Sequence, residues 1–261
     1  MVELLNLSAA LPALLTFFII LLRVSAIIVF APIFSSTSIP AQVKIAFSLI
    51  FAMVLYPVVK QYIHITDFSI MNIAVIVTRE VILSAALAFC VHFLWAGIEL
   101  GAQLVGFMMG FSIANVLSPE ENLQISILAE FESIVAILIF LIIDGHYIFI
   151  RAMADSFKMV PVGGFILNQS VFDVLNKLAL MMFGVAFKIL APAVIALLIT
   201  NVVFGIIART MPQINIMIVA FPLSIGIGLF VLGASFSFSA YVLVKYYNSV
   251  FIHIYSLLGV G

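Results

Sequence analysis

Residues 11–34 read LPALLTFFIILLRVSAIIVFAPIF, and Arg23 is the one charged residue in this run. About 20 apolar residues are enough for a helix to cross the hydrocarbon core of a bilayer. The rest of the chain has the same character, because 66% of its 261 residues are hydrophobic and only 8% are charged. A soluble domain carries roughly 25% charged residues. The sequence therefore predicts an integral membrane protein.

Further apolar segments follow the first one along the chain. We expect helices within residues 45–59, 70–96, 123–143, 178–208 and 214–243. A separate segment rich in Gly and Met covers residues 97–121, and the most polar stretch, residues 144–177, carries several turn signals. No segment alternates like a tilted membrane strand. We predict an all-α, polytopic protein with about six long apolar segments, several of them broken or kinked, in a single domain, residues 1–261.

Charged residues lie within or against these apolar segments. Each costs about 2.5–3.5 kcal/mol at a lipid-exposed helix centre. Two interpretations stay open: a polar path or contact between subunits, and snorkelling or pairing inside the helical bundle. Neighbours on a helix point about 100° apart, so Arg79 and Glu80 should reach different partners, and Glu130 and Glu132 should lie on different faces. The full set is Arg23, Arg79, Glu80, Glu99, Glu130, Glu132 and Lys188.

Prolines and glycines interrupt two of the apolar regions. Pro192 and Pro222 each remove a backbone hydrogen bond and favour a kink. In residues 96–111, the pairs Gly97/Gly101 and Gly106/Gly110 have the GxxxG spacing that lets helices approach closely. Bulky, adaptable side chains interleave with the second pair, and they could seal a pore or simply pack. They are Phe107, Met108, Met109 and Phe111.

Composition and motifs exclude several function classes. The net charge of −1 lacks the basic footprint of a nucleic-acid-binding protein. His64 with Asp67, and Asp144 with His146, have no third ligand at useful spacing, so we expect no metal site. No nucleophile or phosphate-binding motif is present, so neither catalysis nor a cofactor is expected. Cys90 is the single cysteine, which rules out an intrachain disulfide.

Five short motifs in register resemble the FliR family of flagellar export-gate proteins. They are APIFSSTSIPAQVK (31–44), GAQLVGFMMGF (101–111), DGH (144–146), PVGG (161–164) with Leu167 and Asn168, and ARTMPQIN (208–215) with FPL (221–223). Ser118 stands where the family commonly has Asp before the proline. The motif positions are Pro32, Phe34, Pro40, Lys44, Gly101, Gln103, Gly145, His146, Arg209, Pro212, Gln213, Asn215 and Pro222.

The resemblance implies a subunit of the type III export gate, which conducts unfolded flagellar subunits across the bacterial inner membrane at the flagellar basal body. Partners would be FliP-like and FliQ-like gate subunits, an FlhB-like switch protein, the exported chains and membrane lipid. The family's plug loop maps onto residues 106–119. Its implied pore positions are Gly106, Phe107, Met108, Met109, Gly110, Phe111 and Pro119.

The resemblance also implies that buried charges such as Arg79, Glu80 and Lys188 meet partner subunits. Two alternative functions remain open at this point. One is the corresponding gate subunit of a virulence injectisome. The other is a small-solute or ion-coupled secondary transporter, for which charges and broken helices at membrane depth are also typical.

Overall fold

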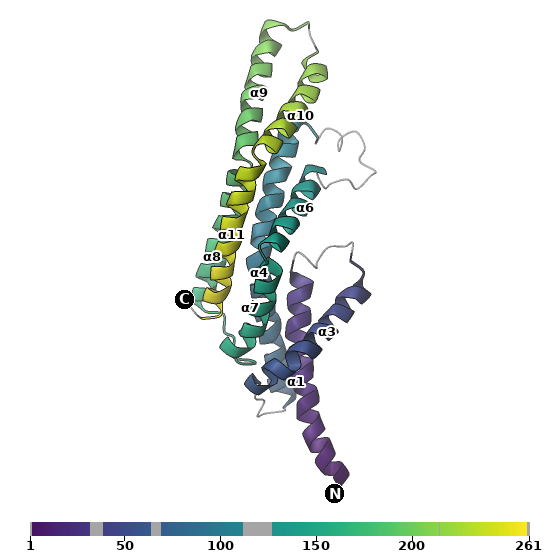
Figure 1. The fold of residues 1–261 in the computed structure, drawn as a ribbon. Coiled ribbons are helices and arrows are strands. Elements are labelled where there is room, and N and C mark those ends of the chain that lie inside the picture. The colour runs from purple at the N-terminus through teal and green to yellow at the C-terminus, as the bar shows by residue number, and fades with distance from the viewer. Residues whose placement is uncertain (1, 32–38, 64–68, 112–126, 214, 260–261) are drawn as a thin grey trace. The chain divides into compact units, whose positions relative to one another are not determined.

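The computed structural model describes residues 2–31, 39–63, 69–111, 127–213 and 215–259, and every regular element in these ranges is a helix. Figure 1 shows the order of the elements along the chain. They are α1 (Val2–Phe30), α3 (Ala41–Val59), the short η1 (Lys60–Tyr62), α4 (Ile70–Met109), α6 (Ile127–Ile142), α7 (Gly145–Met159), α8 (Gln169–Ile189), α9 (Ala191–Thr210), α10 (Ile216–Ala234) and α11 (Phe236–Leu257). The all-α prediction is confirmed.

Five of the described helices are long and apolar enough to cross a membrane by themselves. The number rises to seven if α6 with α7, and α10 with α11, each form one broken span. The prediction of a polytopic membrane protein with about six apolar segments is confirmed. The helix α4 is 40 residues long, and at 1.5 Å per residue it measures about 60 Å, roughly twice the hydrocarbon thickness.

The chain divides into two compact units, each assembled from separate stretches of sequence. Unit 1 comprises Met1–His92, Asp144–Leu178 and Ser249–Gly261. Within it α3 packs against α1 and against α7. Its core includes the fully buried Ile20, Leu83 and Phe157. Cys90 is also fully buried in this unit, and its thiol lies 3.2 Å from the carbonyl oxygen of Ala86.

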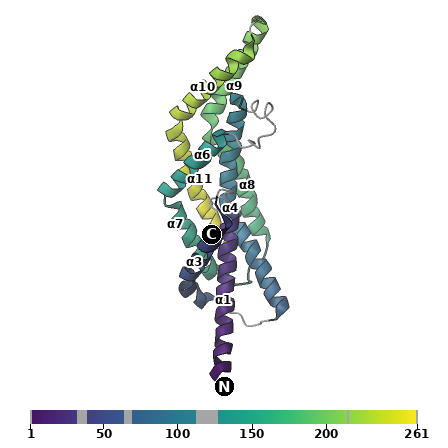
Figure 2. The ribbon, with the colours of Figure 1, turned by 90° about the vertical axis from the view of Figure 1, so that its right-hand side faces the viewer.

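Unit 2 comprises Phe93–Ile143 and Ala179–Asn248. Helices α9 and α10 pack against each other as a hairpin, visible in both ribbon views (Figures 1 and 2). An aromatic cluster closes the core, because the rings of Trp95, Phe140 and Tyr247 lie 5.4–6.2 Å from one another. The buried Tyr247 hydroxyl donates to the carbonyl of Ala136 at 3.0 Å, which satisfies the polar end of this ring.

Four of the predicted segments differ from the structure. Residues 70–96 and 97–109 form one helix, α4, because the glycines after Ala96 pack against a neighbour and do not end the helix. Residues 178–208 are split at Leu190, and Pro192 lies in the first turn of α9, where proline is tolerated because no intrahelical donor is lost.

The third and fourth differences concern the last apolar segment and the polar stretch. Pro222 lies inside α10, and the chain bends by 60° thirteen residues later, where Ser235 separates α10 from α11. The stretch 144–177 is mostly helical and contains α7 and the start of α8. Its turn signals act only between the two helices, in residues 160–168.

Candidate functional site

The C-terminal end of α4 carries most of the predicted pore positions, and it is a tightly capped helix end. Gly110 has φ +92°, a conformation that glycine adopts without steric cost. The N–H of Phe111 donates to the carbonyl of Gly106 at 3.1 Å, and the N–H of Gly110 donates to Phe107 at 3.0 Å. This pair of bonds is the Schellman motif, which fixes where α4 stops.

Two contacts with α10 in unit 2 hold this helix end. The ring of Phe221 occupies the space that a Cβ atom on Gly110 would need. Gly228 lies about two turns further along α10 than Phe221. The side chain of Met109 covers Gly228 and fills the space above its Cα atom. Met109 is completely buried as a result. The small residues Gly110 and Gly228 therefore act as sockets for Phe221 and Met109.

The bulky side chains Phe107, Met108, Met109 and Phe111, called the plug cluster here, have different environments. Phe107 is 68% exposed, whereas Met109 is packed against α10. Met108 and Phe111 are half-buried, and Gly106 is buried. Pro119 and Ser118 lie outside the described residues. The part of the cluster that the structure describes thus has one side chain facing outward and one fixed in the core.

The first GxxxG pair packs against α8, also within unit 2. A Cβ atom on Gly97 would lie 2.6 Å from the carbonyl oxygen of Met182, and one on Gly101 would lie 2.7 Å from that of Ala186. These distances are too short for any side chain, so the two backbones touch. This is the close approach for which GxxxG spacing is used.

A buried ion pair lies at the centre of unit 1. The side chains of Arg23 on α1 and Glu80 on α4 are 0% and 1% exposed. Arg23 uses Nε and Nη2 to bind both carboxylate oxygens, with Nη2 2.9 Å from Oε1. Such two-point pairs are the strongest of the charge-assisted hydrogen bonds. The guanidinium also lies 4.1 Å from the ring centre of Phe157.

Further hydrogen bonds connect this pair to the end of α7 and the loop that follows. Arg23 donates to the Ser156 hydroxyl at 3.3 Å and to the Val160 carbonyl at 3.3–3.4 Å. Glu80 Oε1 accepts from the Gly163 N–H at 3.0 Å. The network therefore ties α1, α4, α7 and the loop together, and it satisfies the polar atoms that burial would otherwise leave unpaired.

Gly163 is the third residue of a β-turn that begins at Pro161. Its φ is +69°, and the N–H of Gly164 donates to the Pro161 carbonyl at 2.8 Å. A turn of type II requires a positive φ at this position. The turn directs the Gly163 carbonyl towards Arg79, which donates to it at 2.7 Å.

The predicted directions of the charged residues are borne out. Arg79 and Glu80 contact different groups, and Glu130 is exposed while Glu132 is buried. The expectation that Glu80 meets a partner subunit is wrong, because Arg23 of the same chain satisfies it. Glu99 and Lys188 are exposed, and the Lys188 ammonium lies 5.9 Å from the ring centre of Tyr246.

Most of the remaining motif positions lie at or next to connections between helices. The α9–α10 turn holds Pro212, Gln213 and Asn215, which are exposed, and Arg209 precedes it in the last turn of α9. Asp144, with φ +55°, precedes α7, whose first residues are Gly145 and His146. Pro40 precedes α3 directly. Lys44 lies in the first turn of α3, Gln103 is exposed on α4, and Pro222 is exposed on α10. Pro32 and Phe34 lie outside the described residues.

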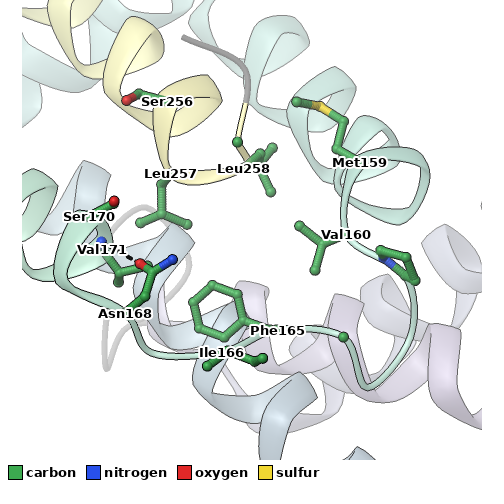
Figure 3. Close-up of a pocket in the computed structure, with 13 residues that line it drawn as sticks. Met159, Val160, Phe165, Ile166, Asn168, Ser170, Val171, Ser256, Leu257 and Leu258 are labelled. Atoms are coloured by element: carbon green, nitrogen blue, oxygen red, sulfur yellow. Dashed lines mark hydrogen bonds between the residues drawn. The ribbon is translucent and has the colours of Figure 1, made fainter.

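A cavity of about 590 Å³ opens beside the loop between α7 and α8 (Figure 3). Phe165, Ile166 and Asn168 line it from the loop, and the end of α11 lines the opposite side with Leu257 and Leu258. The side chain of Asn168 accepts a hydrogen bond from the Val171 N–H at 3.0 Å, which caps the start of α8. The polar side chains that line the cavity are Asn168, which forms this cap, and two serines. The cavity therefore brings no reactive groups together.

The described part of the chain was also compared with the expectation for metal ligands. No three side chains of His, Cys, Asp or Glu in that part lie close enough to hold a metal ion. His64 and Asp67 lie outside the described residues. Asp144 and His146 flank the α6–α7 junction without a third ligand among the described residues.

Sequence reasoning did not identify the partners that complete these two sites. Ser156 and the Val160 carbonyl in the ion-pair network, and Phe221 and Gly228 on α10, were not singled out as site residues. A polar residue in the otherwise apolar face of α7 is a signal for Ser156. No periodicity could have paired Met109 with Gly228, since they are over a hundred positions apart in the chain.

Comparison with known proteins places these features in context. Residues 14–250 match the family "Bacterial export proteins, family 1". The chain is 30% identical to the flagellar biosynthetic protein FliR of Escherichia coli (strain K12), over 82% of this chain and 81% of the relative. It is 26% identical to FliR of Bacillus subtilis (strain 168), over 83% and 84%, and 27% identical to FliR of Aquifex aeolicus (strain VF5), over 77% of each.

Proposed function

Because this chain belongs to the bacterial export proteins, family 1, we infer that it is a flagellar biosynthetic protein that serves as a subunit of the type III protein export gate. The observation that carries this inference is the match over residues 14–250, which includes the capped end of α4 and its two contacts with α10. The substrates are unfolded flagellar subunits. The helices long enough to span a bilayer agree with an integral membrane location.

The proposed seal consists of Phe107, Met108, Met109 and Phe111 at the end of α4, with the segment that follows as far as Pro119. Exposure of Phe107 supports this assignment, since a large apolar ring in the open is available to close a passage. The Schellman cap and the Phe221 and Met109 contacts keep the end of α4 at a fixed place on α10. Soft methionine side chains can re-pack when an exported chain passes.

The chain works with other components of the flagellar export apparatus. We assign it FliP-like and FliQ-like gate subunits and an FlhB-like switch protein as partners, and the inner membrane at the flagellar basal body as its location. Exposed apolar side chains on α9 support lateral contacts of this kind, and they include Ile195, Leu198, Ile199, Val202 and Ile206. The role is non-enzymatic, and the wider apparatus supplies the energy for export.

The transporter alternative receives less support than before. Intramembrane charges were its main motivation, and the most deeply buried pair, Arg23 with Glu80, is fully satisfied inside unit 1. The injectisome alternative is not favoured either, because the relatives described above are flagellar proteins.

Deletion of the gene tests the proposal directly. We expect the deletion strain to stop secreting flagellin and to lose motility, and a plasmid copy to restore both. Normal filaments in the deletion strain would contradict the flagellar assignment. Purification gives a second readout, because a gate subunit should be isolated with other small membrane proteins, whereas a transporter should behave as a monomer or homodimer that binds solute.

A further inference from the structure

Arg79 carries a positive charge that no carboxylate neutralises among the residues that the structure describes. The adjacent acid, Glu80, is fully engaged with Arg23. Arg79 is half-buried, and its Nη1 donates to the Gly163 carbonyl at 2.7 Å. A guanidinium has five N–H donors, so most of them remain for another acceptor. An uncompensated charge on an apolar helix is costly in a membrane.

A cavity of about 190 Å³ lies beside this guanidinium. Arg79 is its one polar side chain, and the other lining residues are Ile82 on α4 and Phe165, Ile166 and Leu167 of the loop. An arginine next to a small apolar cavity suits an anion that presents two oxygens, such as a phosphate or a carboxylate, because the planar guanidinium can bind both at once.

An apolar groove of about 220 Å³ runs between α1 and α4 in the same unit. It extends from Leu15 and Ile73 to Leu22 and Val77. Leu22 directly precedes Arg23, and Val77 lies two positions before Arg79. The remaining lining residues, Phe18, Ile19 and Ile76, are also apolar. Phe18 is 58% exposed, so the groove is open to the surroundings of the helix pair.

Ile76 and Gly163 connect the groove to the cation. Ile76 lines the groove and packs so closely on Gly163 that a Cβ atom there would lie 2.9 Å from it. The carbonyl of that same glycine accepts the hydrogen bond from Arg79. A positive charge therefore lies at one end of an apolar groove, with a single glycine and a single isoleucine between them.

We propose that α1, α4 and the loop of residues 163–167 bind one anionic phospholipid. Its phosphate lies against Arg79, and an acyl chain follows the groove towards Leu15 and Ile73. The charge of the phosphate complements the unpaired guanidinium, and the chain covers the apolar side chains that the groove leaves open. This lipid site belongs to unit 1, shares no residue with the end of α4, and does not depend on the export function.

Native mass spectrometry of the full chain released from detergent tests the proposal. The probes are phosphatidylglycerol and phosphatidylcholine with identical acyl chains, added in equal amounts. We expect the wild-type chain to retain one phosphatidylglycerol in preference to phosphatidylcholine. Arg79→Gln should reduce phosphatidylglycerol retention about tenfold, as expected for the loss of one charge-assisted hydrogen bond.

Arg151→Gln provides the matched control, because Arg151 is exposed on α7 and pairs weakly with Asp155 at 3.8 Å. Its retention of phosphatidylglycerol should equal that of the wild type. Equal losses in the two variants would show a general effect of charge and would overturn the proposal. If Arg79→Gln does not fold, Arg79→Lys keeps the charge, and it should retain phosphatidylglycerol above phosphatidylcholine.

A groove variant separates the acyl-chain contribution from the phosphate contribution. Val77→Trp fills the groove at the end next to Arg79, and it should weaken the retention of both lipids. Unchanged retention would contradict the groove assignment.

Displacement of the lipid by inorganic phosphate alone would indicate a simple anion site. The Arg79→Gln variant could also keep its lipid and lose partner proteins during purification. That result would assign Arg79 to a partner's carboxylate. Either result would overturn the lipid proposal. Flagellin secretion, measured separately, tests the proposed function.

Discussion

The side chains of Arg23 and Glu80 are shielded from water in the folded protein. The free-energy cost of burying their charges must therefore be offset by the partners that replace the water. Removing one member of such a buried pair leaves an uncompensated charge and typically costs about 3–5 kcal/mol. The Gly163 N–H and the Ser156 hydroxyl also depend on this pair. The pair therefore matters less for its net attraction than for the groups that it arranges.

We expect Arg23→Met and Glu80→Met each to destabilise the protein by about 3–5 kcal/mol, because each leaves the opposite charge buried alone. The double variant should recover much of this loss, since two apolar side chains of similar size need no partner. Thermal unfolding in detergent measures the effect. A double variant as unstable as the sum of the singles would contradict this account, and Arg151→Met is the exposed control.

The sequence indicated that Arg79 and Glu80 point in different directions, because adjacent residues on a helix always do. It could not indicate that Glu80 finds Arg23, since the two lie 57 positions apart and their meeting depends on how α1 packs on α4. For this reason the sequence left pairing within the chain and contact with a partner subunit equally open.

Helix ends and helix contacts depend on small residues at particular positions. The apolar runs predicted the existence of helices, but not all their limits. Glycines 97 and 101 looked like a change of segment, although they lie inside α4 and touch α8. Pro192 was a true break and Pro222 was not, because only the first lies in the first turn of a helix. Residue type alone does not distinguish these cases.

Gly101→Ala should therefore destabilise the contact between α4 and α8. The new Cβ atom would lie 2.7 Å from a backbone oxygen of Ala186, and forced overpacking typically costs about 1–3 kcal/mol. Gly205→Ala on α9 is the matched control, since nothing lies within 4 Å of its Cβ position. That change should be neutral or stabilising by up to about 1 kcal/mol. Unfolding midpoints in detergent compare the two variants.

The end of α4 allows stability and sealing to be separated. Phe107 is largely exposed, so Phe107→Ala should leave the unfolding midpoint almost unchanged and increase the ion leak through the assembled gate. Met109 is fully buried, so Met109→Ala should cost about 2–5 kcal/mol by leaving a cavity above Gly228. Ion conductance in cells and thermal unfolding in detergent measure the two effects. Unchanged conductance in a correctly assembled Phe107→Ala gate would contradict its sealing role.

The membrane nature of the whole chain followed from its composition, because so much apolar surface cannot be hidden in a soluble protein of this size. Its division into two units was not predicted. Each unit combines segments that lie far apart in the sequence. A single domain was expected because no long linker, charge run or low-complexity block divides the chain, and this expectation stays a prediction. Long helices such as α4 and α11 contribute residues to both units, which leaves no boundary in the sequence.

The length of α4 leads to a prediction for the chain in a bilayer. Met71 and Phe107 are both exposed on α4, and they are about 54 Å apart along the helix axis. A hydrocarbon core of about 30 Å cannot contain both positions at ordinary helix tilts. We expect an impermeant maleimide, applied from both sides of a proteoliposome membrane, to label at least one of Met71→Cys and Phe107→Cys. Protection of both would show that α4 does not keep its length in the bilayer.

Burial of Cys90 makes such labelling experiments practical with the natural sequence. The chain has one cysteine, and its side chain is fully enclosed in unit 1, so a maleimide reagent should not reach it while the protein stays folded. A second cysteine introduced on any exposed face would then carry a fluorophore or spin label at a single site. Reaction of the native thiol would in turn report unfolding of unit 1, which gives this protein a built-in measure of its own integrity.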